Sequence, residues 1–196
     1  MKEESRLKFL FAENDTVIKF DDTKFYRDYF NKLPEAKGVD FISVAKDKIA
    51  FIEVKNCTGD EGSNRWRIVP DNRKRNTTHT SVNVEGRDSL DIEIAQKTAM
   101  TIAALVGAKS FGNTKECLNE LKEYIQFLSG DSFSNDSKKK YVILFLEGDF
   151  ATKTRTKKMI MKELQDSMNK KLRWINCRVS VVDSDTYDPR IFQIVS

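Results

Sequence analysis

Histidine is nearly absent from this sequence, and cysteine is scarce and scattered. The one histidine, His79, lies in a polar Thr-Thr-His-Thr-Ser stretch, so a histidine-rich metal site is excluded. The three cysteines, Cys57, Cys117 and Cys177, are 60 residues apart, which argues against a disulfide framework and a cysteine-type zinc site. Any hydrolytic chemistry therefore has to come from carboxylates, lysines or hydroxyl groups.

Long apolar runs and several catalytic motifs are also missing. Stretches such as Thr101–Ala108 and Tyr141–Leu146 are too short to cross a bilayer. The N-terminus, Met-Lys-Glu-Glu-Ser-Arg, is charged and has no apolar segment behind it, so no signal or transit peptide is expected and a cytoplasmic location is predicted. A glycine-rich phosphate loop, an HExxH motif, a nucleophile elbow and a CxxC pair are absent, which disfavours kinases, ATPases, zinc proteases and serine hydrolases.

Charge is unevenly distributed along the chain. The formal net charge is +4, but Arg65–Arg75 carries a local +4 and Lys138–Arg173 a local +7, which leaves −7 for the remainder. Such an asymmetry is compatible with a surface that meets a polyanion. For the basic helix expected at 153–171, a solvated face is the plainer interpretation and the one we favour.

The order of predicted elements indicates an α/β fold with a mixed central sheet flanked by helices. A chain of 196 residues can bury one core and is short for two, so residues 1–196 are expected to form a single domain with Trp174 in its core. The expected elements are, in order, a hairpin of Leu7–Phe11 and Thr16–Phe20, a helix at Thr23–Leu33, a β-hairpin of Val39–Ala45 and Ile49–Lys55, helices at 88–109 and Thr114–Leu128, a strand at Tyr141–Leu146, a helix at Thr152–Leu172, and strands at Asn176–Val182 and Ile191–Val195. Residues 58–87 are predicted to form a long loop excursion, which in a compact domain is usually functional or disordered.

The most informative pattern lies in the second predicted hairpin. Because alternate side chains of a strand share a face, Glu53 and Lys55 are expected to project together, while Ile52 and Val54 point into a core. Asp40, at the start of the partner strand, can then lie beside Glu53. A plainer interpretation is a solvated Glu53–Lys55 pair with Asp40 as an ordinary turn residue, but the apolar neighbours favour a central strand.

Two neighbouring carboxylates form an oxygen-rich site suited to Mg²⁺ or Mn²⁺. A divalent ion held by Asp40 and Glu53 would polarise a phosphoryl oxygen and lower the pKa of a bound water. Lys55, held beside two carboxylates, is expected to remain protonated and to stabilise developing negative charge.

These residues resemble the motif of the PD-(D/E)XK nuclease superfamily, since Asp40 is followed after twelve residues by Glu53-x-Lys55. The resemblance covers mainly residues 38–56 and implies a restriction-endonuclease-like αβββαβ core, with Asp40 and Glu53 as metal ligands and Lys55 assisting catalysis. Val39 stands where the motif's name has proline. Members often supply a further acid from before the hairpin, and the acids there, Glu13, Asp28 and Glu35, give no clear match.

The resemblance also implies a polar residue on the helix that follows the motif. Glu93, Gln96 and Lys97 occupy the corresponding stretch, and Gln96 is predicted to face the active centre. In the long excursion, six residues are predicted to contact nucleic acid: Arg65, Trp66, Arg67, Arg73, Lys74 and Arg75. For Trp66, packing as the anchor of the loop is an equally good interpretation.

The sequence thus predicts a Mg²⁺- or Mn²⁺-dependent phosphodiesterase that acts on nucleic acid, with DNA as the expected substrate, as an endo- or exodeoxyribonuclease. The alternative is a catalytically inactive protein of the same fold that binds nucleic acid or a protein partner. No membrane association is expected. A homodimer would suit this activity, because cleavage of both strands of a duplex benefits from two sites.

Overall fold

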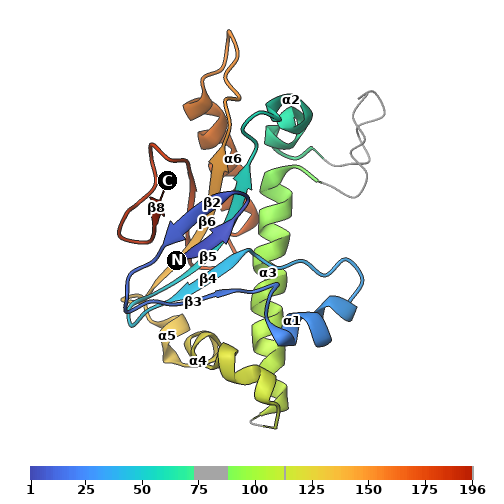
Figure 1. Cartoon of the computed structure of the whole chain (residues 1–196), viewed down its shortest axis with the longest axis vertical. Coiled ribbons are helices and arrows are strands. Elements are labelled where there is room, and N and C mark those ends of the chain that lie inside the picture. Colours follow the sequence, from blue (N-terminus) through green and yellow to red (C-terminus); the bar gives the residue numbers. More distant parts are fainter. Residues whose placement is uncertain (73–87, 113, 196) are drawn as a thin grey trace.

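The computed structural model describes residues 1–72, 88–112 and 114–195, and its centre is a five-stranded mixed sheet (Figure 1). The strands are β3 (Thr16–Lys19), β4 (Phe41–Val44), β5 (Lys48–Asn56), β6 (Lys139–Glu147) and β7 (Arg178–Val182), in the spatial order β3-β4-β5-β6-β7. The β3-β4 and β4-β5 pairs are antiparallel, whereas β5-β6 and β6-β7 are parallel. The expected mixed sheet and the β4-β5 hairpin are confirmed.

A smaller sheet brings the two ends of the chain together. It has the order β1-β2-β8, with β1 at Lys2–Glu4, β2 at Leu7–Leu10 and β8 at Gln193–Val195. The expected hairpin between Leu7–Phe11 and Thr16–Phe20 is therefore wrong, because β2 pairs with β8 while β3 pairs with β4. The partner of β2 lies at the far end of the sequence, where local turn signals carry no information about it.

The helices that pack on the central sheet lie on one of its faces, since no described helix contributes to the apolar cluster on the other face. The α-helices are α1 (Lys24–Asp28), α2 (Glu61–Asn64), α3 (Leu90–Ala108), α4 (Lys122–Ser129), α5 (Asp131–Ser134) and α6 (Lys157–Lys171), and short 3₁₀ turns lie at η1 (Phe30–Lys32), η2 (Arg65–Ile68), η4 (Lys109–Phe111) and η5 (Glu116–Leu121). The helix expected at Thr23–Leu33 is broken into α1 and η1, and the one expected at Thr114–Leu128 begins as η5. Thr23 and Thr156 cap α1 and α6 by accepting hydrogen bonds from backbone amides three residues on.

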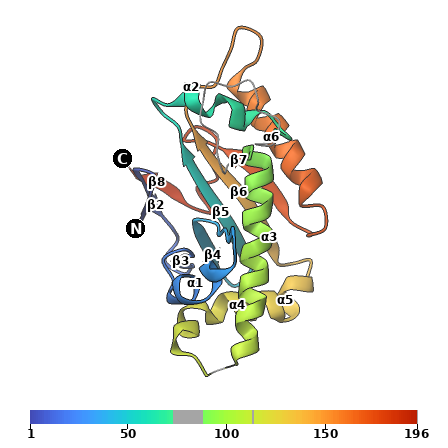
Figure 2. The same cartoon turned by 90° about the vertical axis from the view of Figure 1, so that its right-hand side faces the viewer.

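The two faces of the central sheet bury different apolar layers. Figure 2 shows α3 and α6 on one side of the sheet and β2 and β8 on the other. On one face, Phe51 of β5 packs in the cluster that includes Ile94 of α3 and Leu164 of α6. On the other, Ile52 and Val54 pack with aromatic residues from β2 and the C-terminal segment. The alternation of β5 therefore sends even-numbered side chains to the small sheet and odd-numbered ones to α3.

Trp174 does not lie in the core. Its side chain is 63% exposed, while its neighbours Leu172 and Ile175 are buried, so the expectation for this residue is wrong. None of the helices in the described parts of the chain is long and apolar enough to cross a membrane.

Candidate active site

Glu53 and Lys55 project from β5 toward α3, as the alternation predicts. The Glu53 side chain is 0% exposed and Lys55 keeps 20% of its side chain accessible. Lys55 Nζ lies 2.5 Å from Glu53 Oε1. The interpretation of this pair as a solvated surface pair is therefore wrong for Glu53, which is completely buried.

Asp40 lies directly before β4, opposite Glu53. Phe41 pairs with Ile52 in the β4-β5 register, so the next position along the ladder brings Asp40 beside Glu53. The backbone amide of Val54 donates to Asp40 Oδ2 at 2.7 Å, so the carboxylate takes the place of a backbone carbonyl where the ladder ends. One Asp40 oxygen thus has a structural partner.

The backbone around Asp40 is held by close packing. A Cβ atom on Gly38 would lie 2.6 Å from the Phe20 ring, so only glycine permits this approach. The Phe20 amide donates to the Asp40 carbonyl at 3.2 Å, and the Val39 amide donates to Thr101 Oγ1 of α3 at 3.1 Å. The start of β4 is therefore fixed against both β3 and α3.

Two further charged side chains come from one face of α3. Glu93 and Lys97 are four residues apart, the spacing that places side chains on one helix face. Lys97 Nζ lies 2.5 Å from Glu53 Oε1 and 4.0 Å from an oxygen of Asp40 and of Glu93. Glu93 Oε1 also lies 3.4 Å from Lys55 Nζ. Lys97 thus stands among three carboxylates.

Arg67 of η2 completes this group of charges. Its Nη2 donates to Glu93 Oε2 at 2.5 Å, and its Nη1 donates to Asn64 Oδ1 at 3.2 Å. We refer to these six residues, three acids and three bases, as the acid–lysine cluster: Asp40, Glu53, Lys55, Arg67, Glu93 and Lys97. Helix α3 lies beside β5 in both views of the molecule (Figures 1 and 2).

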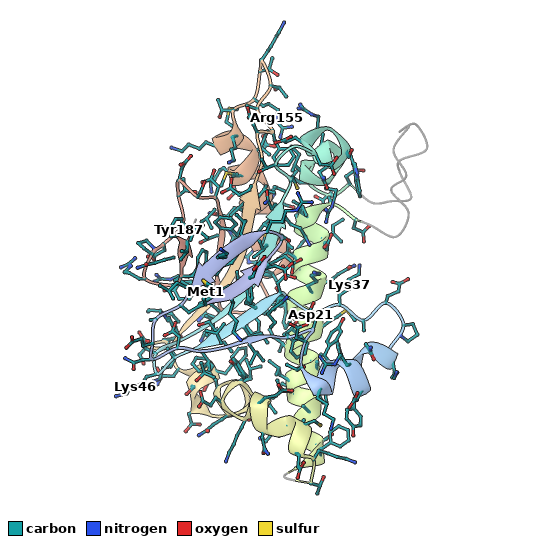
Figure 3. All side chains as sticks on the ribbon, in the orientation of Figure 1. Met1, Asp21, Lys37, Lys46, Arg155 and Tyr187 are labelled. Carbon is teal, nitrogen blue, oxygen red and sulfur yellow. The ribbon has the colours of Figure 1, made fainter. Side chains whose placement is uncertain are left out.

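Gln96, the helix residue predicted to face the centre, lies elsewhere. Its side chain is exposed, and its Oε1 accepts a hydrogen bond from Lys37 at 3.3 Å. Lys37 is labelled beside α3 in Figure 3. Because each helical residue turns by about 100°, Gln96 points away from the direction of Lys97. A signal for the correct residues was available, since Glu93 and Lys97 are four residues apart, the spacing that places two side chains on one helix face.

The acids that precede the hairpin stay outside the cluster. Glu13, Asp28 and Glu35 are all exposed. The third carboxylate beside Asp40 and Glu53 comes instead from Glu93, after the motif.

The residues predicted to contact nucleic acid have different positions. Arg65 is exposed and Trp66 is partly buried, whereas Arg67 is buried and paired with Glu93 inside the cluster. Arg67 is therefore part of the site's own charge network and does not form an open basic surface. Arg73, Lys74 and Arg75 lie outside the described residues.

The cluster shifts its members' pKa values in opposite directions. Burial, followed by the charge of Glu53, raises the pKa of Asp40 to about 7. Burial would lower the pKa of Lys55, but nearby carboxylates, Glu53 foremost, raise it well above its ordinary value. Burial would raise the pKa of Glu93, but Lys55, Arg67 and Lys97 lower it. The lysine therefore stays charged, whereas Asp40 can exchange a proton near neutral pH.

One carboxylate oxygen in the cluster has no partner among the described residues. Glu53 Oε2 is buried and accepts no hydrogen bond from the described residues. Within those residues, no group of three or more His, Cys, Asp or Glu side chains is arranged to hold a metal ion. Asp40 and Glu53 could contribute oxygens to such a site. Asp40 Oδ1 lies 4.0 Å and Glu53 Oε1 lies 2.5 Å from Lys97 Nζ.

Comparison with known proteins gives a family and no activity. The model of a family of unknown function, DUF6661, matches residues 23–196, a range that contains every residue of the cluster. No curated protein and no solved structure matches the chain.

Proposed function

The chain belongs to the DUF6661 family, and we propose that it is a metal-dependent nuclease that hydrolyses phosphodiester bonds, with DNA as its substrate. The observation that carries the proposal is the buried Glu53, whose Oε2 has no partner among the described residues, beside Asp40 and Lys55. A buried, unpaired carboxylate oxygen is costly and calls for an explanation.

The fold supports a restriction-endonuclease-like core. Three antiparallel strands, β3, β4 and β5, are followed by α3 and then by β6, which is parallel to β5. This order is consistent with the βββαβ part of the expected αβββαβ core. The helix expected before the three strands differs, since α1 lies between β3 and β4.

The donor set fits a divalent ion. Mg²⁺ in enzymes is often held by one or two carboxylates while it keeps several waters, and Asp40 and Glu53 supply that number. The free oxygen of Glu53 has capacity for a ligand bond, and a cation would relieve the repulsion by Glu53 that helps to raise the pKa of Asp40. Asp40 and Glu53 would therefore hold Mg²⁺ or Mn²⁺.

When bound, such an ion supplies a polarised phosphoryl oxygen and a water of lowered pKa. In hydrolysis, the water oxygen forms a bond to phosphorus, the bond from phosphorus to the leaving oxygen breaks, and that oxygen takes up a proton. Lys55 remains an ammonium, because its carboxylate neighbours raise its pKa, and it stabilises the negative charge on the phosphoryl oxygens. Glu93 forms ion pairs with both Lys55 and Arg67, so Glu93 and Arg67 orient the Lys55 ammonium.

The proposal is tested by cleavage of single- and double-stranded DNA with Mg²⁺ or Mn²⁺. The wild-type chain is compared with Glu53→Gln, and Glu116→Gln serves as the matched control because Glu116 is an exposed acid outside the cluster. We expect cleavage by wild type and the control, and its loss in Glu53→Gln and in EDTA. Equal cleavage by both variants, or none by wild type with either metal, would reject the proposal.

A specific observation favours a second candidate, a nuclease-fold protein that binds nucleic acid without cleaving it. The three acids of the acid–lysine cluster are balanced by three bases, and Lys97 already contacts all three carboxylates within 4.0 Å. A site neutralised in this way can persist without a metal. Titration with Mn²⁺ separates the two candidates. The nuclease predicts saturable Mn²⁺ binding by wild type that Glu53→Gln abolishes, whereas the second candidate predicts no such binding.

A further inference from the structure

The exposed Trp174 lies in a segment rich in basic residues. It follows the end of α6, in the connection to β7. Residues 169–178 contain four cations and no acid, namely Lys170, Lys171, Arg173 and Arg178. Large aromatic side chains are normally buried, so a largely exposed tryptophan among cations is a candidate binding surface.

Local packing holds this tryptophan outward. Leu172 and Ile175 are buried on either side of it, and the Ile175 amide donates to the Leu172 carbonyl at 2.9 Å. The turn is therefore anchored by its neighbours, while the Trp174 ring stays 63% exposed.

The ring borders a hollow of the surface. The hollow has a volume of about 460 Å³, and Asn169, Arg173, Trp174 and Asn176 are among the residues that line it. Ligand pockets usually measure about 300–1,000 Å³, so a nucleotide-sized group fits here. The lining combines the Trp174 ring, a guanidinium and two side-chain amides with apolar residues, and the Asn176 amide donates to Asp136 Oδ1 at 3.3 Å.

The charges around Trp174 indicate which kind of partner would bind there. Among the four cations, Lys171 is the one that forms ion pairs within the described residues, with Asp71 and Asp91. The remaining three are exposed. A symmetric contact between two copies of the chain around Trp174 would bring these like charges together. A polyanion, in contrast, is complementary to them.

We propose that this surface, which we call the Trp174 patch (Asn169, Lys170, Arg173, Trp174 and Asn176), binds single-stranded nucleic acid, with Trp174 stacking on a base and Lys170 and Arg173 facing phosphates. Stacking on an aromatic ring accepts any base, and a basic groove follows the backbone. The inference rests on the proposed function in that its ligand is the substrate of the proposed nuclease.

The patch and the candidate site are connected through α3. Lys171 Nζ, at the end of α6, lies 2.7 Å from Asp91 Oδ2 in the first turn of α3, and Glu93 of the acid–lysine cluster follows two residues later. The adjacent helices α3 and α6 are seen in Figure 2. A strand held at the patch would therefore extend over the start of α3 toward the site.

Binding is measured in EDTA, so that no cleavage is involved. Because the chain has two tryptophans, Trp66→Phe leaves Trp174 as the sole indole, and its fluorescence is followed during titration with a 15-nucleotide oligo(dT). We expect quenching that saturates, with an affinity that falls between 50 and about 200 mM salt. Absence of quenching while the oligonucleotide binds would overturn the proposed stacking.

A pair of substitutions separates stacking from simple hydrophobic contact. By fluorescence anisotropy of a labelled oligo(dT), Trp174→Leu is expected to weaken binding by about 5- to 150-fold, the range of one lost base stack, and Trp174→Phe by much less. Equal affinities of wild type and Trp174→Leu would overturn the proposal, as would a salt-independent affinity or a Trp174-dependent dimer in sedimentation. Both variants alter an exposed side chain, and circular dichroism checks their folding.

Failure of this inference and failure of the nuclease proposal are distinguishable. If the chain binds oligo(dT) through Trp174 but cleaves no DNA, the Trp174 patch is supported and the nuclease proposal fails. If the chain cleaves DNA and Trp174→Leu leaves the affinity for oligo(dT) unchanged, the nuclease proposal is supported and the Trp174 patch fails.

Discussion

Helix α3 joins two groups of charges, each built around a fully buried carboxylate, that differ in how completely this carboxylate is hydrogen-bonded. One is the acid–lysine cluster around Glu53. The other surrounds Asp91, which is also 0% exposed, and we call it the Asp91 cluster (Asp71, Ser89, Asp91, Ser167 and Lys171). Asp91 and Glu93 are only two residues apart, yet they belong to different groups.

Every oxygen of Asp91 has partners. Its Oδ1 accepts from Ser89 Oγ at 2.6 Å, and its Oδ2 accepts from Ser167 Oγ at 2.8 Å, from the Asp71 amide at 3.1 Å and from Lys171 Nζ at 2.7 Å. Burial would raise the pKa of Asp91, but these donors, Lys171 first, lower it below its ordinary value. This carboxylate ties together α3, α6 and the segment that follows η2.

The acid–lysine cluster has the opposite character. Both lysines share Oε1 of Glu53, its Oε2 is unpaired within the described residues, and the pKa of Asp40 is raised to about 7. A buried carboxylate that serves only stability would have both oxygens paired, as Asp91 does. The contrast therefore indicates that the Asp91 cluster serves stability, while the acid–lysine cluster retains unsatisfied groups for a function.

The largest expected effect is the loss of cleavage when Glu53 of the acid–lysine cluster is replaced. Glu53→Gln should lower metal-dependent cleavage by about a thousandfold or more, equivalent to about 4 kcal/mol, because a metal ligand is removed. Its free energy of unfolding should stay within about 1 kcal/mol of wild type, since weakened lysine pairs and relieved repulsion of Asp40 act in opposite directions. Cleavage rates and urea unfolding of the same preparations test this. A fully active variant would contradict the proposed role of Glu53.

The converse is expected at Asp91. Asp91→Asn should reduce the free energy of unfolding by about 3 kcal/mol, because an amide nitrogen would face donors in place of an accepting oxygen, and Lys171 would lose a buried partner. Cleavage per folded molecule should be retained at a temperature where the variant is folded. Urea unfolding in EDTA provides the measurement. A variant as stable as wild type would show that Asp91 does not have this structural role.

Much of the fold could be predicted because its signals are local. The β4-β5 hairpin follows from two apolar runs around Lys46-Asp47-Lys48, and α3 from apolar spacing after Ser89. The pairing of β2 with β8 could not, because the two strands are separated by almost the whole sequence. The exposure of Trp174 was missed for a related reason: composition predicts average burial, not which residue of a turn faces out.

The candidate site was predictable where one strand determined it. Alternation alone places Glu53 and Lys55 on the same face. The contribution of α3 depends on how that helix rotates against the sheet, which is set by buried contacts such as those of Leu90 and Ile94. The sequence therefore predicts Gln96 at the centre, where the structure has Glu93 and Lys97. Arg67 enters through tertiary packing of a segment that the sequence describes only as an excursion.

Lys97 provides a sharper test of the acid–lysine cluster. Its ammonium contacts all three carboxylates, and like charges about 4 Å apart repel by several kcal/mol even at an effective dielectric constant of about 20. Lys97→Met should therefore raise the affinity for Mn²⁺ by about tenfold or more. Calorimetric titration measures the change, with Lys171→Met as the matched control in the Asp91 cluster. Unchanged Mn²⁺ affinity in Lys97→Met would mean that this lysine does not oppose a cation.

The smallest expected effects concern pH, where the two clusters should respond with opposite signs. The folded-state pKa of Asp40 is raised to about 7, so its contribution to stability in EDTA is fully present below the ordinary aspartate pKa and is lost as pH rises toward 7. The pKa of Asp91 is lowered, so its contribution is present above the ordinary aspartate pKa and is lost on acidification. Asp40→Asn and Asp91→Asn should remove these two slopes separately when urea unfolding is measured across pH.

The same titration of Asp40 should appear in metal binding. A carboxylate must be deprotonated to bind a cation, and the pKa of Asp40 is about 7. Lowering the pH from 8 to 6 should therefore weaken Mn²⁺ binding by about tenfold, with one proton released per ion bound at the lower pH. Calorimetry in buffers of different ionisation enthalpy counts the proton. Binding that is independent of pH over this range would show that Asp40 is not a ligand, and would leave Glu53 as the carboxylate that distinguishes the acid–lysine cluster from the Asp91 cluster.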